Sequence, residues 1–334
     1  MEATTKPASV LFACVAENQQ TWFQKVQNLA LSLRHLGGSL AGSPMVANFV
    51  GGVDESYRRA LEELNVEVSV VQPFHPTNPY ANKLRMLELG DGRRVDTLVA
   101  LDCDTVVVDD IVPFLQDGAV AAKPADVDFL SQDQWRRIFS AFSLREPERA
   151  YTTTTFGQLT YPYFNSGVLL VPRVLCEPLL AQWGRFIFEL EAVYRTHPDI
   201  AARRKYNDQI ALTCALGASA LPVRSLPLAM NFPTHLNIHR SLLTQRSRIR
   251  VVHYHGDIDQ RGFLRASKYR EVNRYLDRFN RRRAETLNLA YGHLPSRDIA
   301  ARIRHELASR RWYHDVRVER LRGRVKSMLA SLSR

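Results

Sequence analysis

The stretch LVALDCDTVVVDDI, residues 98–111, decides the fold class. It opens with four apolar residues, which predict a buried strand, and Asp102 and Asp104 follow where that strand would end. Alternate residues of an extended chain point the same way, so both carboxylates can reach one cation. Oxygen ligands suit Mn²⁺ or Mg²⁺, and ligands bind at strand ends in open α/β sheets. Taken alone, the pair is equally compatible with solvated acids at a strand end.

Upstream of this strand, short apolar runs alternate with amphipathic stretches, which predicts an α/β fold with a parallel sheet and crossover helices. We expect strands over 9–15, 44–52 and 66–74 and helices over 24–38, 56–65 and 82–90. The apolar run 10–16 is read as the first buried strand rather than as a signal-peptide core, because polar ENQQ follows it at once.

Downstream, the periodicity weakens between residues 124 and 163, which predicts a long connection or lid rather than a core element. Regular elements are then expected again, as strands over 163–172 and 248–256 and as helices over 178–195 and 208–217. The sequence contains no internal repeat and no low-complexity linker.

The composition is that of a globular protein able to bury a core, with 334 residues of which 45% are hydrophobic. No apolar stretch approaches the roughly 18 to 20 residues of a membrane-spanning helix. The four cysteines occur singly within apolar runs, which predicts reduced, buried thiols in a cytoplasmic protein.

The net charge of +11 is concentrated near the C-terminus, where residues 271–334 hold 16 Lys and Arg against 7 Asp and Glu. This region also carries an apolar stripe at helical spacing, with arginines off the stripe; its residues are Val318, Leu321, Val325, Met328 and Leu332. Such a basic amphipathic helix either packs on the body of the protein or docks peripherally on an anionic membrane.

Four further segments share their order with a known family: YANKLRMLELG before the acidic pair, then YFNSGVLLVP, KYNDQIALTCAL and VVHYHGD. Together they resemble the retaining glycosyltransferases of family 8, the group that contains glycogenin and bacterial lipopolysaccharide galactosyltransferases. The resemblance covers residues 9 to 260. It implies a GT-A type nucleotide-diphospho-sugar transferase fold with a mixed, mainly parallel central sheet. The catalytic domain would span residues 1–270, followed by the basic helical C-terminal extension over 271–334.

The resemblance also implies a set of site residues. Asp102, Asp104 and His253 would bind Mn²⁺ or Mg²⁺, while Asn165, Asp208 and Gln209 would be catalytic and lie at the donor sugar. Further donor-binding positions are Glu17, Asn18, Lys83, Cys103, Asp126, Gly256 and Arg261. His255 would contact the substrate or support the metal ligands.

The chain departs from the family pattern in the segment after His253. The family's HY-x-G is usually followed by a lysine and a Pro-Trp pair that grip the diphosphate, whereas this chain continues as DIDQRGF over 257–263. Arg261 is the nearest cation in that segment and would supply the charge.

The implied activity is transfer of a hexose from a nucleotide-diphosphate sugar, most simply a UDP-sugar, to a glycan or lipid-linked acceptor with retention of configuration. One alternative is a haloacid dehalogenase-type phosphatase with Asp102 as nucleophile, although about a hundred residues precede that strand and its GD-x-x-x-D motif is missing. A sugar nucleotidyltransferase would need a glycine-rich loop where ENQQTW stands. A basic nucleic-acid-binding protein is compatible with the tail but leaves the ordered motifs unexplained.

Overall fold

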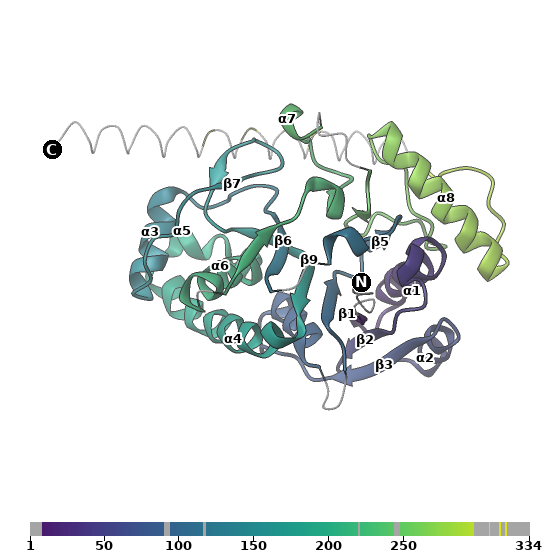
Figure 1. Ribbon diagram of the computed structural model, residues 1–334, viewed down its shortest axis with the longest axis horizontal. Coiled ribbons are helices and arrows are strands. Elements are labelled where there is room, and N and C mark those ends of the chain that lie inside the picture. The colour runs from purple at the N-terminus through teal and green to yellow at the C-terminus, as the bar shows by residue number, and fades with distance from the viewer. Residues whose placement is uncertain are drawn as a thin grey trace, which may run out of the picture.

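The computed structural model describes residues 9–89, 94–115, 118–219, 221–243 and 248–296, together with the single residues 307, 314 and 318. A central sheet of seven strands lies between helices on its two faces (Figure 1). Its strands, in spatial order, are β10 (Val223–Ser225), β6 (Val120–Pro124), β9 (Phe164–Pro172), β4 (Thr97–Leu101), β1 (Val10–Glu17), β2 (Met45–Val50) and β3 (Val66–Val71).

All neighbouring strands of this sheet are parallel except around β9, which is antiparallel to both β4 and β6. The predicted mixed, mainly parallel sheet is therefore confirmed. Two smaller sheets accompany it, one of β11 (Phe232–Pro233), β12 (Val251–His253) and β5 (Thr105–Val107), the other of β7 (Tyr151–Thr152) and β8 (Leu159–Thr160).

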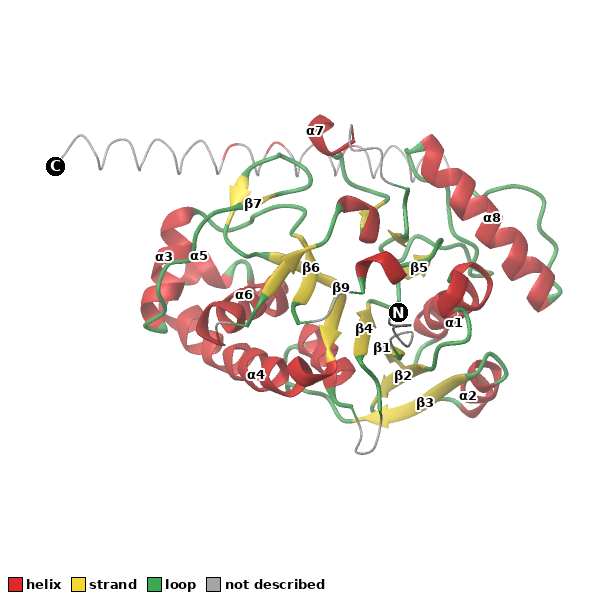
Figure 2. Cartoon of the chain, in the orientation of Figure 1, coloured by secondary structure: helices red, strands yellow, loops and turns green. Residues whose placement is uncertain are grey.

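The α-helices are α1 (Gln20–Leu36), α2 (Glu55–Glu62), α3 (Gln132–Ala141), α4 (Arg173–Thr196), α5 (Pro198–Ala201), α6 (Asn207–Ser219), α7 (Arg240–Leu243) and α8 (Arg270–Leu287). Short 3₁₀ helices are η1 (Gly38–Leu40), η2 (Pro79–Leu87), η3 (Val112–Phe114), η4 (Arg204–Tyr206) and η5 (Leu228–Met230). Figure 2 shows how the helices cover the strands.

The alternation of side chains along β1 explains why the sheet is covered on both faces. Leu11 and Ala13 pack into a core shared with α4 and α6, while Val10, Phe12 and Cys14 pack into a second core shared with α1. A strand buried on both sides is apolar on both faces, and β1 is apolar from Val10 to Ala16, before Glu17 ends it.

Two expectations from the sequence are wrong. The segment predicted as an α-helix over 82–90 is the 3₁₀ helix η2, which begins earlier because Asn78 caps it and Pro79 fixes its first turn. The region 124–163 is not a structureless connection, since it contains α3, whose Trp135 is fully buried in the core.

The predicted C-terminal extension begins with α8, which packs beside α1 (Figure 1). Its apolar residues Val272, Leu276 and Phe279 are completely buried in a third core with the small β5 sheet. The predicted basic helix around 318–332 lies outside the described residues, apart from Val318. The division into a domain of 1–270 and an extension therefore stays a prediction.

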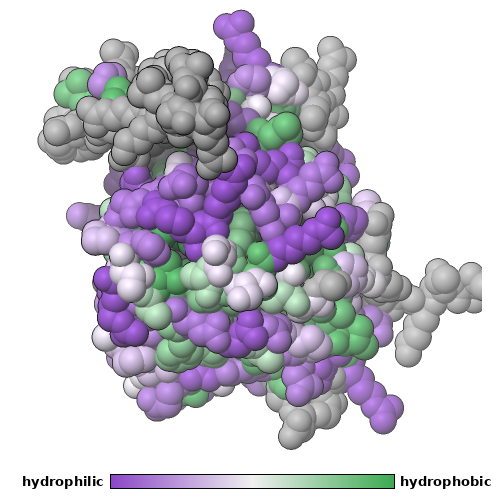
Figure 3. Space-filling view, turned by 90° about the vertical axis from the view of Figure 1, so that its left-hand side faces the viewer, coloured by the Kyte–Doolittle hydropathy of each residue, from purple (hydrophilic) through white to green (hydrophobic). Residues whose placement is uncertain are grey.

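Other expectations agree with the structure. All four cysteines are buried and free. Among the described helices, none combines the length and the apolar character that crossing a membrane requires. On the face shown in Figure 3, hydrophobic residues form separate patches between hydrophilic ones, as on ordinary protein surfaces.

Candidate active site

The topology brings three of the sequence motifs to one edge of the sheet. Strands β4 and β6 end at the same edge, and the antiparallel strand β9 begins there between them. Asp102 follows β4, Asp126 follows β6, and Asn165 is the second residue of β9. Segments distant in the sequence therefore meet because β9 reverses direction.

The small sheet adds the late histidine to this edge. Strand β5 follows Asp104 directly and pairs with β12, so that Thr105 lies opposite His253. The His253 Nε2 atom is 3.1 Å from Oδ1 of Asp104 and 3.9 Å from Oδ2 of Asp102. One ligand atom from each of the three residues lies within 4.8 Å of the other two. These residues form the carboxylate–histidine cluster.

A directed chain of hydrogen bonds fixes the ring of His253. The buried Lys123 ammonium donates to Asp126, and the Asn165 amide Nδ2 donates to the same carboxylate at 2.9 Å. Asn165 Oδ1 then accepts from Nδ2 of Asn231 at 3.1 Å, which turns Oδ1 of Asn231 toward Nδ1 of His253, also at 3.1 Å. Because that oxygen can only accept, Nδ1 of the histidine carries the proton.

This tautomer suits a metal ligand. With Nδ1 protonated, the lone pair of the neutral ring is on Nε2, the atom that faces the two carboxylates. A proton on Nε2 would instead be donated to Asp104. Burial raises the pKa of Asp104, but that hydrogen bond and the accompanying charge of His253 outweigh burial and hold the pKa below its usual range. An ion bound at the cluster would take the place of this proton. Two carboxylate oxygens and one imidazole nitrogen, with the ring held from behind, fit Mn²⁺ or Mg²⁺.

Gly167 of the FNSG segment is required by the packing at the cluster. A methyl group there would lie 2.7 Å from Cε1 of His253, 2.8 Å from Oδ2 of Asp102 and 3.0 Å from Oδ1 of Asn165. Its carbonyl accepts from the Asp102 amide at 2.8 Å. The absence of a side chain therefore lets three functional groups approach one another.

A second charged group adjoins the cluster. The Lys83 ammonium, from η2, contacts Oδ2 of Asp102 at 2.9 Å and Oδ2 of Asp208 at 3.4 Å. It also donates to the Ser166 hydroxyl at 3.2 Å, and that hydroxyl donates to Asp208 at 2.6 Å. Burial alone lowers the pKa of Lys83, yet the carboxylates of Asp102 and Asp208 raise it above its usual value, so this lysine is charged.

Asp208 and Gln209 stand in the first turn of α6, as the DQ pair predicts. The Asp208 side chain is almost fully buried, and its backbone carbonyl accepts from the indole of Trp183 at 2.8 Å. Gln209 is half-buried beside it. Among the predicted catalytic residues, Asp208 and Asn165 thus have their side chains tied into the site's polar network.

Other predicted donor-binding residues are not part of the cluster. Glu17 ends β1, and the Asn18 side chain accepts from the Asp54 amide at 2.8 Å, so both lie at the carboxyl edge of the sheet near the start of α1. The Cys103 thiol is buried in the apolar core, where burial raises its pKa well above the usual value. Arg261 donates to the carbonyl of Ala290 at 2.9 Å.

Gly256 has a φ of 73° in the turn that follows β12, which favours glycine. The preceding His255 is also left-handed, with a φ of 51°, and its ring stacks on His253 at a centroid distance of 3.7 Å and contacts His235 at 3.9 Å. Burial and these neighbouring histidines lower the pKa of His255 well below its usual value, so it is neutral near pH 7.

Sequence reasoning missed three residues of this network: Lys123, Ser166 and Asn231. Ser166 lies inside the FNSG motif and so had a signal, although only its neighbour was singled out. Neither Lys123 nor Asn231 had such a signal in the sequence. Lys123 lies within the apolar strand β6, and Asn231 follows the short 3₁₀ helix η5, which has no visible period.

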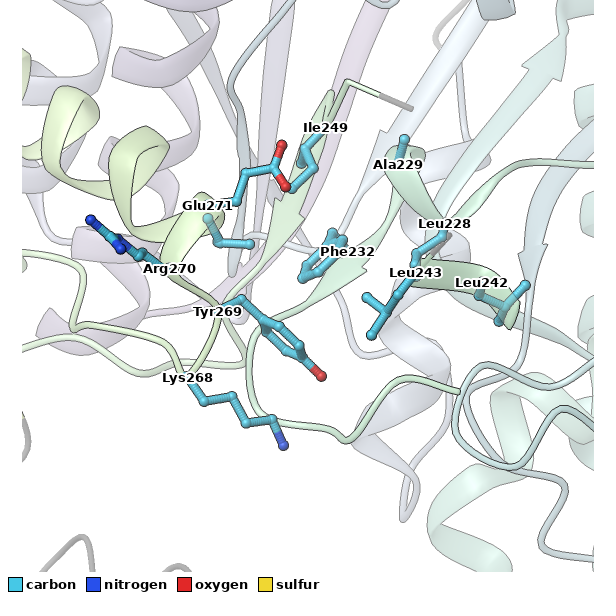
Figure 4. Close-up of a pocket in the computed structure, with 11 residues that line it drawn as sticks. Leu228, Ala229, Phe232, Leu242, Leu243, Ile249, Lys268, Tyr269, Arg270 and Glu271 are labelled. Carbon is cyan, nitrogen blue, oxygen red and sulfur yellow. The ribbon is translucent and has the colours of Figure 1, made fainter. Parts of the chain in front are cut away.

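A separate pocket of about 240 Å³ lies between η5, α7, β11 and the start of α8 (Figure 4). Phe232, Tyr269 and Leu243 point into it, with Lys268 at its side. It contains none of the cluster residues, and apolar side chains share its lining with the charged residues Lys268, Arg270 and Glu271.

The mixed sheet with its acidic pair at the end of β4 defines a GT-A type glycosyltransferase fold. Residues 12–219 match the Rhodobacterales glycosyltransferase domain, and the chain belongs to this family. The predicted fold and family resemblance are thereby confirmed, and the protein is a transferase that acts on a glycosyl donor. This assignment favours transfer over the phosphatase and nucleic-acid-binding alternatives. No curated protein sequence matches the chain significantly.

Solved structures of glycosyltransferases are similar to this chain. The galactosyltransferase LgtC, in complex with donor and acceptor sugar analogues, shares the fold; it is 18% identical with a TM-score of 0.50, over 79% of this chain and 93% of that one. The bifunctional glycosyltransferase WbbM is 16% identical with a TM-score of 0.49, over 76% of this chain, which spans only 47% of WbbM. Mouse xyloside xylosyltransferase 1 is 13% identical with a TM-score of 0.43, over 74% of this chain and 97% of that one.

Proposed function

We propose that this protein is a metal-dependent hexosyltransferase that uses a UDP-sugar and transfers its hexose to a glycan or lipid-linked acceptor. The observation that carries the proposal is the carboxylate–histidine cluster, whose three ligand atoms lie within 4.8 Å of one another. The complex of LgtC with donor and acceptor sugar analogues supports the same class of substrates.

In this proposal Asp102, Asp104 and His253 hold Mn²⁺ or Mg²⁺. The ion, when bound, stabilises the negative charge that develops on the departing nucleoside diphosphate. The chain's own contribution is to orient the ligands, since Asn231 holds the ring of His253 and Lys83 holds Asp102.

The donor sugar would lie beside Asn165, Asp208 and Gln209. Asp208 and Lys83 form a charged pair that presents fixed hydrogen-bonding groups to sugar hydroxyls, which orients the reacting carbon before the bond breaks. Glu17 and Asn18, at the end of β1, would contact the nucleoside.

We propose retention of configuration, from the resemblance to the retaining glycosyltransferases. A double displacement would need a carboxylate nucleophile, and Asp126 and Asp208 are the two candidates. Asp126 already accepts from Lys123 and Asn165, and Asp208 from Ser166. Hydrogen bonds to both carboxylates lower their nucleophilicity, which favours attack by the acceptor on the front face without a covalent intermediate.

The deciding experiment is isothermal titration calorimetry with a panel of UDP-, GDP- and ADP-sugars, with Mn²⁺ and with chelator. We expect one class of donor to bind with Mn²⁺ and to lose about 100-fold or more of its affinity in Asp102→Asn, Asp104→Asn and His253→Ala. Asp133→Asn, which neutralises a solvated carboxylate on α3, is the matched control. Donor binding that is equal with and without chelator would contradict the proposal.

The acceptor and location belong to the same proposal. We place the protein in the cytoplasm, with its basic C-terminal segment docking peripherally on anionic membrane, because 11 Lys and Arg against 4 Asp and Glu follow Ser296. Such docking would bring the active site to a lipid-linked or membrane-proximal glycan.

A further inference from the structure

Lys25, on the second turn of α1, is a cation without a counter-ion in the described part of the chain. Its ammonium lies 4.3 Å from the centroid of the Trp22 ring and forms no hydrogen bond or ion pair with a described residue. By contrast, the ammonium groups of Lys83 and Lys123 each contact a carboxylate within 3.0 Å. The side chain is half-buried.

The position of Lys25 is fixed by the packing of α1 against the loop that follows β12. The side chain of Gln24 donates to the carbonyl of Gln260 at 3.0 Å, and that of Asn28 donates to the carbonyl of Gly262 at 2.9 Å. A methyl group on Gly256 would lie 3.3 Å from both Cε and Nζ of Lys25. The ammonium therefore lies against the turn that begins just after His253.

Lys25 also lies close to the cluster through this turn. His255, the residue before Gly256, stacks on the ring of His253 at a centroid distance of 3.7 Å, and Gly256 is the residue that Lys25 contacts. Along the chain, α1 starts directly after Glu17 and Asn18, at the edge assigned to the nucleoside. A diphosphate that joins a nucleoside there to a sugar at the cluster would pass between these two places. Lys25 lies on the helix that starts near the first place and against the turn that follows His253 at the second.

We propose that Lys25 binds the diphosphate of the nucleotide-sugar. Helix α1 provides the cation because no cation in the loop after Gly256 is free to do so. The inference rests on the proposed function of the cluster. Arg261 does not compete for the role, since its guanidinium donates to Ala290 and lies over the ring of Phe263. Because Gly256 has no side chain between its backbone and Lys25, a phosphate can approach both the backbone of the turn and the ammonium.

The test is calorimetry of UDP and UMP in the presence of Mn²⁺. Lys25→Gln should lower the affinity for UDP by about 10- to 100-fold, the range of a lost charge-assisted hydrogen bond. The affinity for UMP should fall by less than about 3-fold, because UMP lacks the second phosphate. Lys25→Arg keeps the charge and should retain most of the affinity for UDP.

Arg185→Gln on α4 is the matched control, because it also removes a cation that lies over an aromatic ring, at 4.3 Å from the centroid of Phe186. It should change neither affinity. Failure of the wild-type protein to bind any nucleoside diphosphate with Mn²⁺ would overturn the proposed function and this inference with it. Wild-type binding together with unchanged UDP affinity in Lys25→Gln, or equal losses for UDP and UMP, would overturn this inference alone. Thermal unfolding of each variant identifies a loss of fold.

Discussion

Gly167 is the residue at which the site is most sensitive to a single added carbon. A Cβ atom there would collide with His253, Asp102 and Asn165, and all three contacts are 3.0 Å or shorter. Gly167→Ala should therefore push the carboxylate–histidine cluster apart and lower Mn²⁺-dependent donor affinity by about 10-fold or more. Calorimetry with donor and Mn²⁺ measures this loss.

Gly217→Ala is the control for this substitution. Gly217 lies in α6, and a methyl group added to it would have no atom within 4 Å, so alanine should stabilise the helix by up to about 1 kcal/mol. Donor affinity should not change in this variant. Equal donor affinity in Gly167→Ala and wild type would show that the cluster is not where the donor binds.

Asn231 determines which nitrogen of His253 faces the two carboxylates. Asn231→Ala removes the acceptor at 3.1 Å from Nδ1, so the ring can change tautomer and rotate. We expect Mn²⁺ affinity to fall by about 10- to 100-fold, as for other groups that hold a metal-binding histidine. Titration of Mn²⁺ followed by electron paramagnetic resonance measures free ion directly, and an unchanged affinity would contradict the role of the hydrogen-bond chain.

The buried pair of Lys123 and Asp126 predicts a pH dependence of stability. Burial raises the pKa of the Asp126 carboxyl, but Lys123 outweighs it and leaves the pKa below its usual value. A carboxyl whose pKa is depressed by folding stabilises the protein above its unfolded pKa of about 3.9, and this contribution is lost as the pH falls through the lower folded value.

Urea unfolding between pH 3 and pH 6 checks this prediction. The free energy of unfolding should fall with pH below about 4 in wild type and less steeply in Asp126→Asn, which has no carboxyl to protonate. At pH 7 the same variant should be less stable by about 3 to 5 kcal/mol, because Lys123 is left buried without its counter-charge. Parallel pH profiles for the two proteins would contradict the pair's contribution.

At the scale of the elements, the strands and helices that could be predicted from the sequence are those whose buried residues follow a clear apolar pattern. Strand β1 is apolar from Val10 to Ala16 and β9 contains the apolar run 168–172, while α1 and α4 are long enough for a helical period to be visible. Helix α3 was not predicted, because only three of its ten residues are buried and its apolar period is weak. The capping box of Ser131 and Gln134 is nevertheless a sequence pattern typical of a helix N-terminus.

Helix α8 illustrates how a strongly basic segment can belong to the core. Most of its arginines are exposed or half-buried, while Phe279 is fully buried against the small sheet. Phe279→Ala should lower the free energy of unfolding by about 3 to 5 kcal/mol, the cost of a buried phenylalanine. The exposed Glu285→Ala on the same helix should change it by less than about 0.5 kcal/mol. Urea denaturation compares the two, and equal small effects would mean that α8 is not an integral part of the fold.

At the scale of the whole molecule, the cluster depends on the order in which segments return to one edge of the sheet. Asp102 and Asp104 were predicted from a local pattern, whereas the place of His253 followed from the family resemblance and not from its surroundings in sequence. Asn231 contacts His253 through the packing of the segment before β11, and Lys25 contacts the turn at Gly256 through the packing of α1. Contacts between such distant segments leave no periodic trace in one sequence, which is why these residues were missed.

The basic C-terminal region gives a prediction for the whole molecule. Ser296 is a suitable place to truncate, because the Pro295 carbonyl accepts from Ala266 at 2.7 Å and the Ser296 carbonyl accepts from Arg265 at 3.1 Å. A chain of residues 1–296 keeps α8 and every residue of the cluster, so its Mn²⁺-dependent donor binding should equal that of the full chain. It loses 11 Lys and Arg and 4 Asp and Glu, a net charge of +7.

If that charge docks the protein on a membrane, each basic residue near an anionic surface contributes about 1 kcal/mol, and salt screens the attraction over a Debye length of about 10 Å at 0.1 M. The full chain should then sediment with phosphatidylserine vesicles at low salt, be released as salt is added, and ignore phosphatidylcholine vesicles. The chain of residues 1–296 should remain in the supernatant throughout. Sedimentation of both chains would place the docking surface on the body, and sedimentation of neither would make the acceptor a glycan that the enzyme meets in solution.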